Sequence, residues 1–459
     1  MVPMKQLQII PENNSSLIPV VDPIPVTAFC LPVISFQNDQ NGNALLGLNL
    51  SPCTTYLKHL CPRVRSRPSK ECNEICESMR KYREESRITE EKKLAIERFR
   101  EELEFYFTNA LRDLGGRRVV LEVYGSTKNG FGTKDCDVDM SLTFKPDCPP
   151  WVSDGNGISA ADAVMREVAK VLVDYPNTLD ERFISAKVPI VRFRGVQMDI
   201  EADISFDNQL AIHNTSLISY YYYWDPRRLP AVGVWIKTWA KRCGIGDASK
   251  GGLSSYAWII MLIHYCQNTG NPPFLRRLQM EPKHGITEEV FVSSWNVYFW
   301  KFCNPHENLH EDTSVYDLFI GFLEYYIAFL SMRRKEVIQI RQSCIVYKTS
   351  VPKWSKHELC VEDPFELDHN LAQGVSPEMC DYILACLIHS RKVFLDRRLR
   401  KTFLTNRNAT NINVIDGDLL TDYGNFLLRC CVLDKEPPLR HFIRDRTYSQ
   451  ATNLSGETF

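Results

Sequence analysis

The chain has 459 residues, of which 44% are hydrophobic and 24% are charged, so it is long enough for two or three packed units of ordinary globular composition. Its formal charge is −1, from 55 Lys and Arg against 56 Asp and Glu, which argues against a stand-alone, high-affinity nucleic-acid binder. The 16 cysteines are scattered through apolar segments, and prolines and asparagines interrupt the N-terminus where a secretory leader would be apolar. We therefore expect reduced, mostly buried thiols in a cytosolic or nuclear protein, and of the two locations we expect the cytoplasm.

The first part of the chain, residues 1–76, is rich in Pro, Asn and Ser and shows no helical period, which predicts a poorly ordered leader. A helix is expected at residues 77–89, and we place it with the helical domain that follows later in the chain. A long amphipathic helix is predicted next, from apolar residues that recur at helical spacing between charged ones. These residues are Leu94, Phe99, Leu103, Phe107 and Leu111.

Strands are predicted by their content of β-branched and aromatic residues. They lie at 119–124, 138–144, 188–193 and 196–206, the last two joined across Gly195. After about residue 210 the pattern becomes mainly helical. The chain is thus expected to form an α/β domain, a helical domain and a tail. The expected bounds are 90–230 for the α/β domain, 77–89 with 231–430 for the helical domain, and 431–459 for the flexible tail.

Membrane insertion is not expected from the distribution of apolar residues. No stretch reaches the roughly 18–20 apolar residues that a membrane helix needs. The best run, residues 318–330, is short and carries Glu324. We therefore expect no membrane partner.

The strongest chemical signal is a Gly-Ser pair followed, ten residues later, by two aspartates at the start of a strand. Gly125 lets the backbone approach a phosphate closely, and Ser126 supplies a hydroxyl to it. Asp137 and Asp139 are two residues apart, so they lie on the same face of the strand and can hold divalent cations jointly. The carboxylate oxygens of these aspartates are hard ligands, which Mg²⁺ and Mn²⁺ prefer. This pattern favours nucleotidyl transfer assisted by two metal ions.

Such a site needs a third carboxylate near the pair. Asp199 and Asp203 both fall on a later predicted strand, and the residues alone do not choose between them. An isolated acidic pair is usually a solvated surface feature. A Gly-Ser pair between two strands, at this distance from the aspartates, makes the pattern far more specific.

The segment 124–139, which begins Tyr-Gly-Ser and ends Asp-Val-Asp, closely resembles the catalytic signature of the polymerase-beta-like nucleotidyltransferases. Within that superfamily the chain is similar to the cytoplasmic terminal uridylyltransferases, or poly(U) polymerases, and to their poly(A)-adding relatives. The resemblance runs from about residue 85 to residue 430 and includes further segments in the family's order. These are 188–191, 212–215, 237–241, 253–256, 295–298 and 362–370.

The resemblance implies an α+β fold. A polymerase-beta-like catalytic domain, with a mixed sheet and helices, would face a mainly helical PAP-associated domain, with the nucleotide in the cleft between them. The implied activity is template-independent addition of UMP from UTP to RNA 3′ ends. By this resemblance Asp203, and not Asp199, joins Asp137 and Asp139 as the catalytic carboxylates that hold two Mg²⁺ or Mn²⁺ ions.

The resemblance also implies nucleotide contacts. Lys237 and Lys241 are four residues apart on one helix face and would bind the triphosphate, although such a pair can also be a solvated basic face. Ser255 would contact a phosphate. Tyr256 would stack on the base without regard to its identity, although a tyrosine in an apolar helix is more often part of the core. Contacts to the sugar are implied for Asn208, Asn214 and Thr215.

Base choice is assigned by the resemblance to the loop at residues 362–370. Members that prefer UTP carry a histidine where this chain has His369. An imidazole can donate a hydrogen bond to uracil O4, whereas adenine presents an amino donor at that place. Asp363 and Glu366 match acidic residues that help to place the uracil edge. A histidine outside this motif would be interpreted as structural.

Two other functions remain open at this point. One is a cytoplasmic poly(A) polymerase of the same architecture, and the other is an inactive relative that acts as an RNA or protein scaffold. The expected partners are UTP and single-stranded RNA 3′ ends, with RNA-binding proteins to choose the substrate, and no DNA. The presence of all three carboxylates and both lysines favours an active enzyme.

Overall fold

The computed structural model describes residues 70–112, 118–145, 160–196, 199–270, 273–280, 290–301 and 313–395, together with 37–38 and 44–45. The last two pairs form β1 (Gln37–Asn38) and β2 (Ala44–Leu45), which pair antiparallel. They belong to a separate unit, Met1–Thr54, and all other described residues belong to the unit Thr55–Phe459. Most of the expected leader, and the whole expected tail at 431–459, lie outside the described residues.

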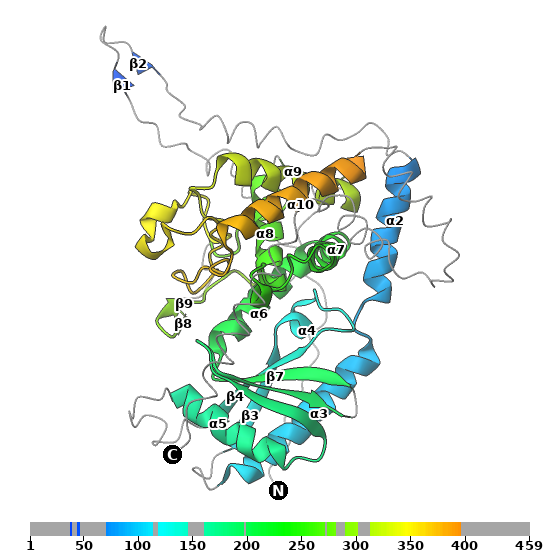
Figure 1. Cartoon of the computed structure of the whole chain (residues 1–459), viewed down its shortest axis with the longest axis vertical. Helices are drawn as coiled ribbons and strands as arrows, with labels where there is room; N and C mark the ends of the chain where they lie inside the picture. The colour runs from blue at the N-terminus through cyan, green and yellow to red at the C-terminus, as the bar shows by residue number, and fades with distance from the viewer. Residues whose placement is uncertain are drawn as a thin grey trace, which may run out of the picture. The chain divides into compact units, whose positions relative to one another are not determined.

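Among the described residues, the α/β part of the larger unit, from residue 90 to residue 206, is built on a five-stranded sheet (Figure 1). This part corresponds to the expected catalytic domain and is named the catalytic part. Its strands are β3 (Arg118–Tyr124), β4 (Val138–Lys145), β5 (Thr178–Ile184), β6 (Ile190–Gly195) and β7 (Ile200–Phe206). Their spatial order is β3-β4-β7-β6-β5. The β4–β7 pair is parallel and the other three pairs are antiparallel, so the sheet is mixed, as the sequence predicts.

The alternation of side chains along the central strands separates a core face from an open face of the sheet. Met140 in β4 and Ile204 in β7 are fully buried in one apolar cluster with residues of two helices. Those helices are α3 (Glu90–Ala110) and α5 (Ala160–Val173). Asp139 and Asp203 alternate with these buried residues, so they lie on the opposite face of the sheet. Figure 1 shows the helical part of the molecule on that side.

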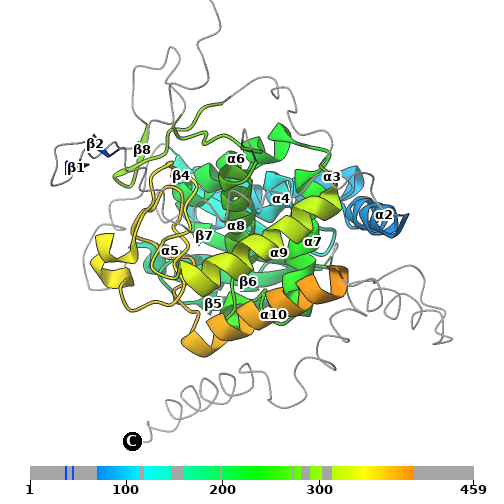
Figure 2. The same ribbon diagram turned by 90° about the horizontal axis from the view of Figure 1, so that it is seen from above.

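The helical part has its own aromatic core. Its helices are α2 (Lys70–Glu85), α6 (Gln209–Trp224), α7 (Leu229–Arg242), α8 (Ser255–Asn268), α9 (Val315–Met332) and α10 (Pro377–Leu395). Trp239 of α7 and Trp258 of α8 are fully buried, with ring centroids 5.6 Å apart. Helices α9 and α10 lie side by side (Figure 2), and Arg391 pairs with Glu324 at 2.8 Å. This core holds the helices together on the side of the sheet that carries Asp139 and Asp203.

The boundaries of the helical part differ from those expected from the sequence. Helix α2 begins at Lys70 rather than near residue 77, and its residues Ile75 and Met79 are buried in the core shared with α7 and α9. Leu217 and Ile218 of α6 are buried in the same core. Helix α6 directly follows β7 and packs on both sides, because it enters the helical core and also contacts β3 and the helix α4 (Ser126–Asn129).

The structure corrects one local expectation and adds one strand that the sequence did not predict. Leu94 does not lie on the buried face of α3, because its side chain is 59% exposed while Ile96 is 3% exposed. Strand β5 was not predicted, because acidic residues interrupt its apolar pattern. It lies at an edge of the sheet, where charged side chains can point into solvent.

Helix α9 is longer and more apolar than the sequence reading allowed. Its 18 residues, Val315–Met332, have a mean hydropathy of 1.4, which is enough to cross a membrane by length and composition alone. Within the fold, 72% of the helix is buried, and Phe319 and Phe322 lie in the helical core. The hydropathy of α9 is therefore accounted for by its central position in that core.

Candidate active site

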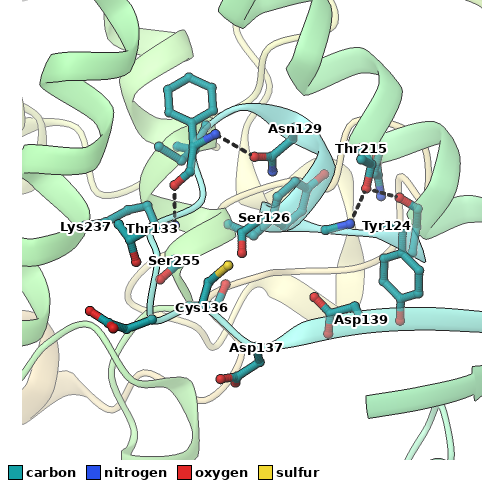
Figure 3. Close-up of a pocket in the computed structure, with 18 of the residues that line it drawn as sticks. Tyr124, Ser126, Asn129, Thr133, Cys136, Asp137, Asp139, Thr215, Lys237 and Ser255 are labelled. Atoms are coloured by element: carbon teal, nitrogen blue, oxygen red, sulfur yellow. Dashed lines mark hydrogen bonds between the residues drawn. The ribbon is translucent and has the colours of Figure 1, made fainter. Parts of the chain in front are cut away.

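Three carboxylates meet on the open face of the sheet. Asp139 in β4 is the direct register partner of Asp203 in β7, so parallel pairing places the two side chains next to each other on the same face. Asp137 precedes β4 and lines the same cavity as Asp139 (Figure 3). The structure therefore brings together the three residues that the resemblance implied.

The electrostatics of these carboxylates reflect burial and mutual repulsion. Burial, followed by the charges of Asp203 and Asp137, raises the pKa of Asp139 to about 7. The pKa of Asp137 is also raised, first by burial and then by nearby Glu201 and Asp203. Carboxylates with raised pKa values at one place create a site that favours a divalent cation.

Arg192 in β6 holds the third carboxylate, Asp203, in place by two hydrogen bonds. It is the register partner of Asp203 on the side away from Asp139. Its Nε and one terminal nitrogen donate to the two oxygens of Asp203 at 2.8 and 2.7 Å. Asp199 is instead paired with Arg194, and 69% of its side chain is exposed. The geometry thus separates Asp203, which lies at the site, from Asp199, which does not.

Gly125 brings the backbone against the carboxylate row. Its φ is +73°, and a Cβ built on it would lie 2.3 Å from Oδ2 of Asp139, so no other residue fits without displacing that carboxylate. The N–H of Gly125 donates to Oγ1 of Thr215 at 2.8 Å, and Thr215 donates in turn to the Ala211 carbonyl. Thr215 therefore fixes the Gly-Ser turn, in addition to any contact with a sugar.

The cavity beside this turn has a volume of about 480 Å³ and lies between the catalytic and helical parts. Ser126, the first residue of the short helix α4 (Ser126–Asn129), lines one wall. Lys237 and Lys241 of α7 and Ser255, at the start of α8, line the other, and Figure 3 shows Ser126, Lys237 and Ser255 around one space. Hydroxyl and ammonium groups from three helices suit the oxygens of a triphosphate.

Lys237 is the more constrained of the two lysines. Its Nζ donates to the Phe131 carbonyl at 2.7 Å. Burial lowers the pKa of Lys237 to about 8, and the charge of Lys241 acts in the same direction. An incoming polyphosphate would restore the charged form of Lys237 by supplying the missing negative partner.

The far end of the cavity is connected to the expected base-recognition loop through Asp363. Asn214 donates to Asp363 at 3.1 Å, and the hydroxyl of Tyr256 donates to it at 3.5 Å. Asn214 and Tyr256 both line the cavity. Oδ1 of Asn214 is buried and has no hydrogen-bond partner among the described residues. A sugar hydroxyl would be a suitable donor for it.

The remaining predicted residues do not line the cavity itself. Glu366 and His369 lie on the loop beyond Asp363, where the N–H of Asp363 donates to the His369 carbonyl at 3.1 Å. Asn208 precedes α6, and its amide donates to the hydroxyl of Tyr124 at 3.3 Å. The structure thus shows Asn208 supporting the end of β3 and does not show it in the cavity.

The donor set fits a hard divalent cation only in part. The oxygens of Asp137 and Asp139 are of the type that Mg²⁺ and Mn²⁺ prefer. Within the described ranges, no three potential ligands converge closely enough to form a ready-made metal group. Both oxygens of Asp203 are held by Arg192. The raised pKa of Asp139 supports a cation at this place.

Sequence reasoning missed three residues that the structure places at or near the site. Arg192 follows the segment 188–191, which was noted for its resemblance but not for its charge. Cys136, between the Gly-Ser turn and Asp137, lines the cavity. Lys187 reaches the recognition loop from the β5–β6 connection. Pairing across strands reveals the role of Arg192, and pairing across the cleft reveals that of Lys187, so no local pattern could have found these two. Cys136 lies inside the motif itself, where its position directly before Asp137 was the available signal.

Comparison with known proteins agrees with this geometry. Residues 75–223 match the family described as poly(A) RNA polymerase, mitochondrial-like, central palm domain, and residues 314–369 match the Cid1 family poly A polymerase. Terminal uridylyltransferase 7 of Homo sapiens is 34% identical over 316 residues, which cover 65% of this chain and 20% of that protein. Poly(A) RNA polymerase GLD2 of Danio rerio is 34% identical over 285 residues, which cover 60% of this chain and 54% of that protein.

The fold has a counterpart among solved structures. The structure of Cid1 in complex with its short product ApU superposes with a TM-score of 0.59 at 22% identity, covering 77% of this chain and 98% of that one. The expected fold and the expected resemblance to terminal uridylyltransferases and poly(A) polymerases are confirmed. The chain spans about a fifth of the length of the uridylyltransferase and about half of the length of GLD2.

Proposed function

We propose that this chain, a relative of the terminal uridylyltransferases and poly(A) RNA polymerases, adds UMP from UTP to the 3′ ends of single-stranded RNA. The observation that carries the proposal is the register match of Asp139 with Asp203 beside the Gly125 turn. A row of carboxylates, which would bind the cations, lies next to a cavity that is lined by lysines of the helical part. Nucleotidyl transfer needs these two features side by side.

In the proposed reaction the RNA 3′-hydroxyl oxygen attacks the α-phosphorus of UTP. A phosphodiester bond forms, the bond to the β-phosphate oxygen breaks, and pyrophosphate leaves. Lys237, Lys241 and Ser255 would hold the triphosphate chain, and Ser126 would approach it from the opposite wall. Asp137, Asp139 and Asp203 would hold Mg²⁺ or Mn²⁺, which when bound would activate the hydroxyl and stabilise the leaving pyrophosphate.

The preference for uracil rests on the recognition loop. Nδ1 of His369 lies 3.3 Å from Oε2 of Glu366, and a contact with a carboxylate requires a proton on that nitrogen. The other ring nitrogen is then free to face a base. As imidazolium it donates to uracil O4, and as neutral imidazole it accepts from uracil N3–H. A histidine also leaves less room for a purine.

A poly(A) polymerase is the second candidate, because GLD2 is as similar in identity as the uridylyltransferase. The cavity residues described above would serve either nucleotide, since triphosphate and ribose are common to both. The stacking surface of Tyr256 would also accept either base. The choice between the two activities therefore rests on the loop that carries His369.

The deciding experiment incubates the purified chain with an end-labelled single-stranded RNA and each of the four nucleoside triphosphates in turn, with Mg²⁺ or Mn²⁺. We expect extension with UTP at the lowest concentration. Preferred use of ATP would replace the uridylyltransferase proposal with the poly(A) alternative. No extension, together with no pyrophosphate release from any nucleotide, would support an inactive scaffold. The matched control is Asp137→Ala, which removes a metal ligand from the surface of the site.

A further inference from the structure

An ion pair crosses from the sheet to the recognition loop. Lys187 lies in the connection between β5 and β6, and its Nζ is 2.5 Å from Oε1 of Glu366. The two residues are 179 positions apart in the sequence. Lys187 belongs to the catalytic part and Glu366 to the helical part, so the pair joins the two walls that enclose the nucleotide cavity.

Glu366 uses its two oxygens for different partners. Oε1 accepts from Lys187, and Oε2 lies 3.3 Å from Nδ1 of His369. The carboxylate therefore stands between a lysine of one wall and the imidazole of the other. Its orientation determines whether Nδ1 carries the ring proton, and this in turn determines what the opposite ring nitrogen can offer to a base.

The backbone of the loop is fixed without this pair. Oδ1 of Asp363 accepts from the N–H groups of Phe365 and Glu366, both at 3.0 Å. The N–H of His369 donates to the Glu366 carbonyl at 2.8 Å. These bonds define the path of the chain but leave the Glu366 carboxylate free to rotate about its side-chain torsions. Within the part of the chain that the structure describes, Lys187 is the contact from outside the loop that limits this rotation.

We propose that Lys187 is a positioning residue for base selection. By holding one oxygen of Glu366, it keeps the other oxygen on Nδ1 of His369 and directs the opposite ring nitrogen toward the base. The choice of nucleotide therefore depends on Lys187 of the catalytic part as well as on Glu366 and His369 of the helical part. This inference rests on the proposed function, because it refines how the same site distinguishes UTP from ATP.

The expected effect is modest because the pair is partly solvated. The side chain of Lys187 is 62% exposed and that of Glu366 is 23% exposed. Exposed ion pairs change an equilibrium by up to about fivefold. Loss of Lys187 should therefore lower the ratio of UTP to ATP efficiency by about two- to fivefold, and a repelling charge at the same position should lower it further.

The test compares Lys187→Ala, Lys187→Glu and Lys187→Arg with the wild type. The matched control is Lys353→Ala, because Lys353 pairs with Asp368 of the same loop at 2.7 Å and is 54% exposed, close to the 62% of Lys187. That pair does not cross the cavity and does not involve Glu366. The measurement is kcat and KM for UTP and for ATP on one RNA primer, with thermal unfolding as a check on folding.

We expect Lys187→Ala to raise KM for UTP and Lys187→Glu to raise it further. For both variants, kcat at saturating UTP and KM for ATP should stay near the wild-type values. Lys187→Arg should restore selectivity, and Lys353→Ala should leave it unchanged. An unaltered UTP to ATP ratio in Lys187→Glu would overturn the inference, as would an equal loss in Lys353→Ala. If the wild type itself does not prefer UTP, the proposed function fails instead.

Discussion

Replacing Asp139 with asparagine tests the repulsion among the three carboxylates. The change keeps the size of the side chain but removes its charge. It should abolish nucleotidyl transfer, because a metal ligand and a negative charge are lost together. It should also make the protein more stable when no divalent cation is present, which is unusual for a substitution of a half-buried residue.

The magnitude follows from the pKa of Asp139, which is raised from the ordinary 3.8 to about 7. Between these values the folded chain binds more protons than the unfolded chain, so the free energy of unfolding falls as the pH rises. One pH unit corresponds to about 1.4 kcal/mol. Ionised Asp139 therefore costs the folded protein about 4 kcal/mol above pH 7, and about 1 kcal/mol at pH 4.5.

The assay is urea-induced unfolding of wild type and Asp139→Asn in the presence of EDTA at pH 8 and at pH 4.5. We expect the variant to be more stable by up to about 4 kcal/mol at pH 8, with most of this difference lost at pH 4.5. Addition of Mg²⁺ or Mn²⁺ at pH 8 should stabilise the wild type more than the variant. Equal stability at pH 8 in EDTA would refute the assignment of Asp139 to a repulsive carboxylate group.

Three further changes probe separate parts of the site. Arg192→Ala should slow transfer by about tenfold or more, because the Asp203 carboxylate loses the partner that orients it. The control Arg194→Ala, on the same strand, should leave the transfer rate near that of the wild type. Similar rates for the two variants would exclude a positioning role for Arg192. KM for UTP should rise as the pH passes about 8, where Lys237 loses its charge, and Lys237→Arg should flatten this pH profile. His369→Ala should lower UTP efficiency by about tenfold or less, the worth of one hydrogen bond, and raise the use of ATP; an unchanged UTP to ATP ratio would make His369 structural.

The sequence was most informative where chemistry is local. The Gly-Ser pair and the two aspartates of the first motif lie within 15 residues, and their geometry follows from one turn and one strand. The amphipathic helix before them and the mixed α+β character were also predictable from periodicity. Asp203 could be separated from Asp199 only by resemblance, because strand register decides which of them faces Asp139.

Contacts between distant segments could not be read from the sequence. The pairing of Arg192 with Asp203 depends on the antiparallel register of β6 and β7. The pairing of Lys187 with Glu366 depends on how the sheet part and the helical part pack against each other. The start of α2 was placed too late because its first turns are polar, and only packing against α7 shows that Ile75 and Met79 are core residues.

The parallel pairing of β4 with β7 also has a consequence for how activity arises during folding. Strands β3 and β4 can pair with each other, and β5, β6 and β7 can form a meander, each from neighbouring segments of chain. The β4–β7 pairing is the seam that joins these two halves, and Asp139 and Asp203 face each other across it. A slip of one residue at the seam would turn Asp203 toward the core. A partly assembled sheet would therefore contain Asp139 in one half and Asp203 in the other, but the two carboxylates would not be adjacent. Catalytic activity should appear only when β4 has paired with β7.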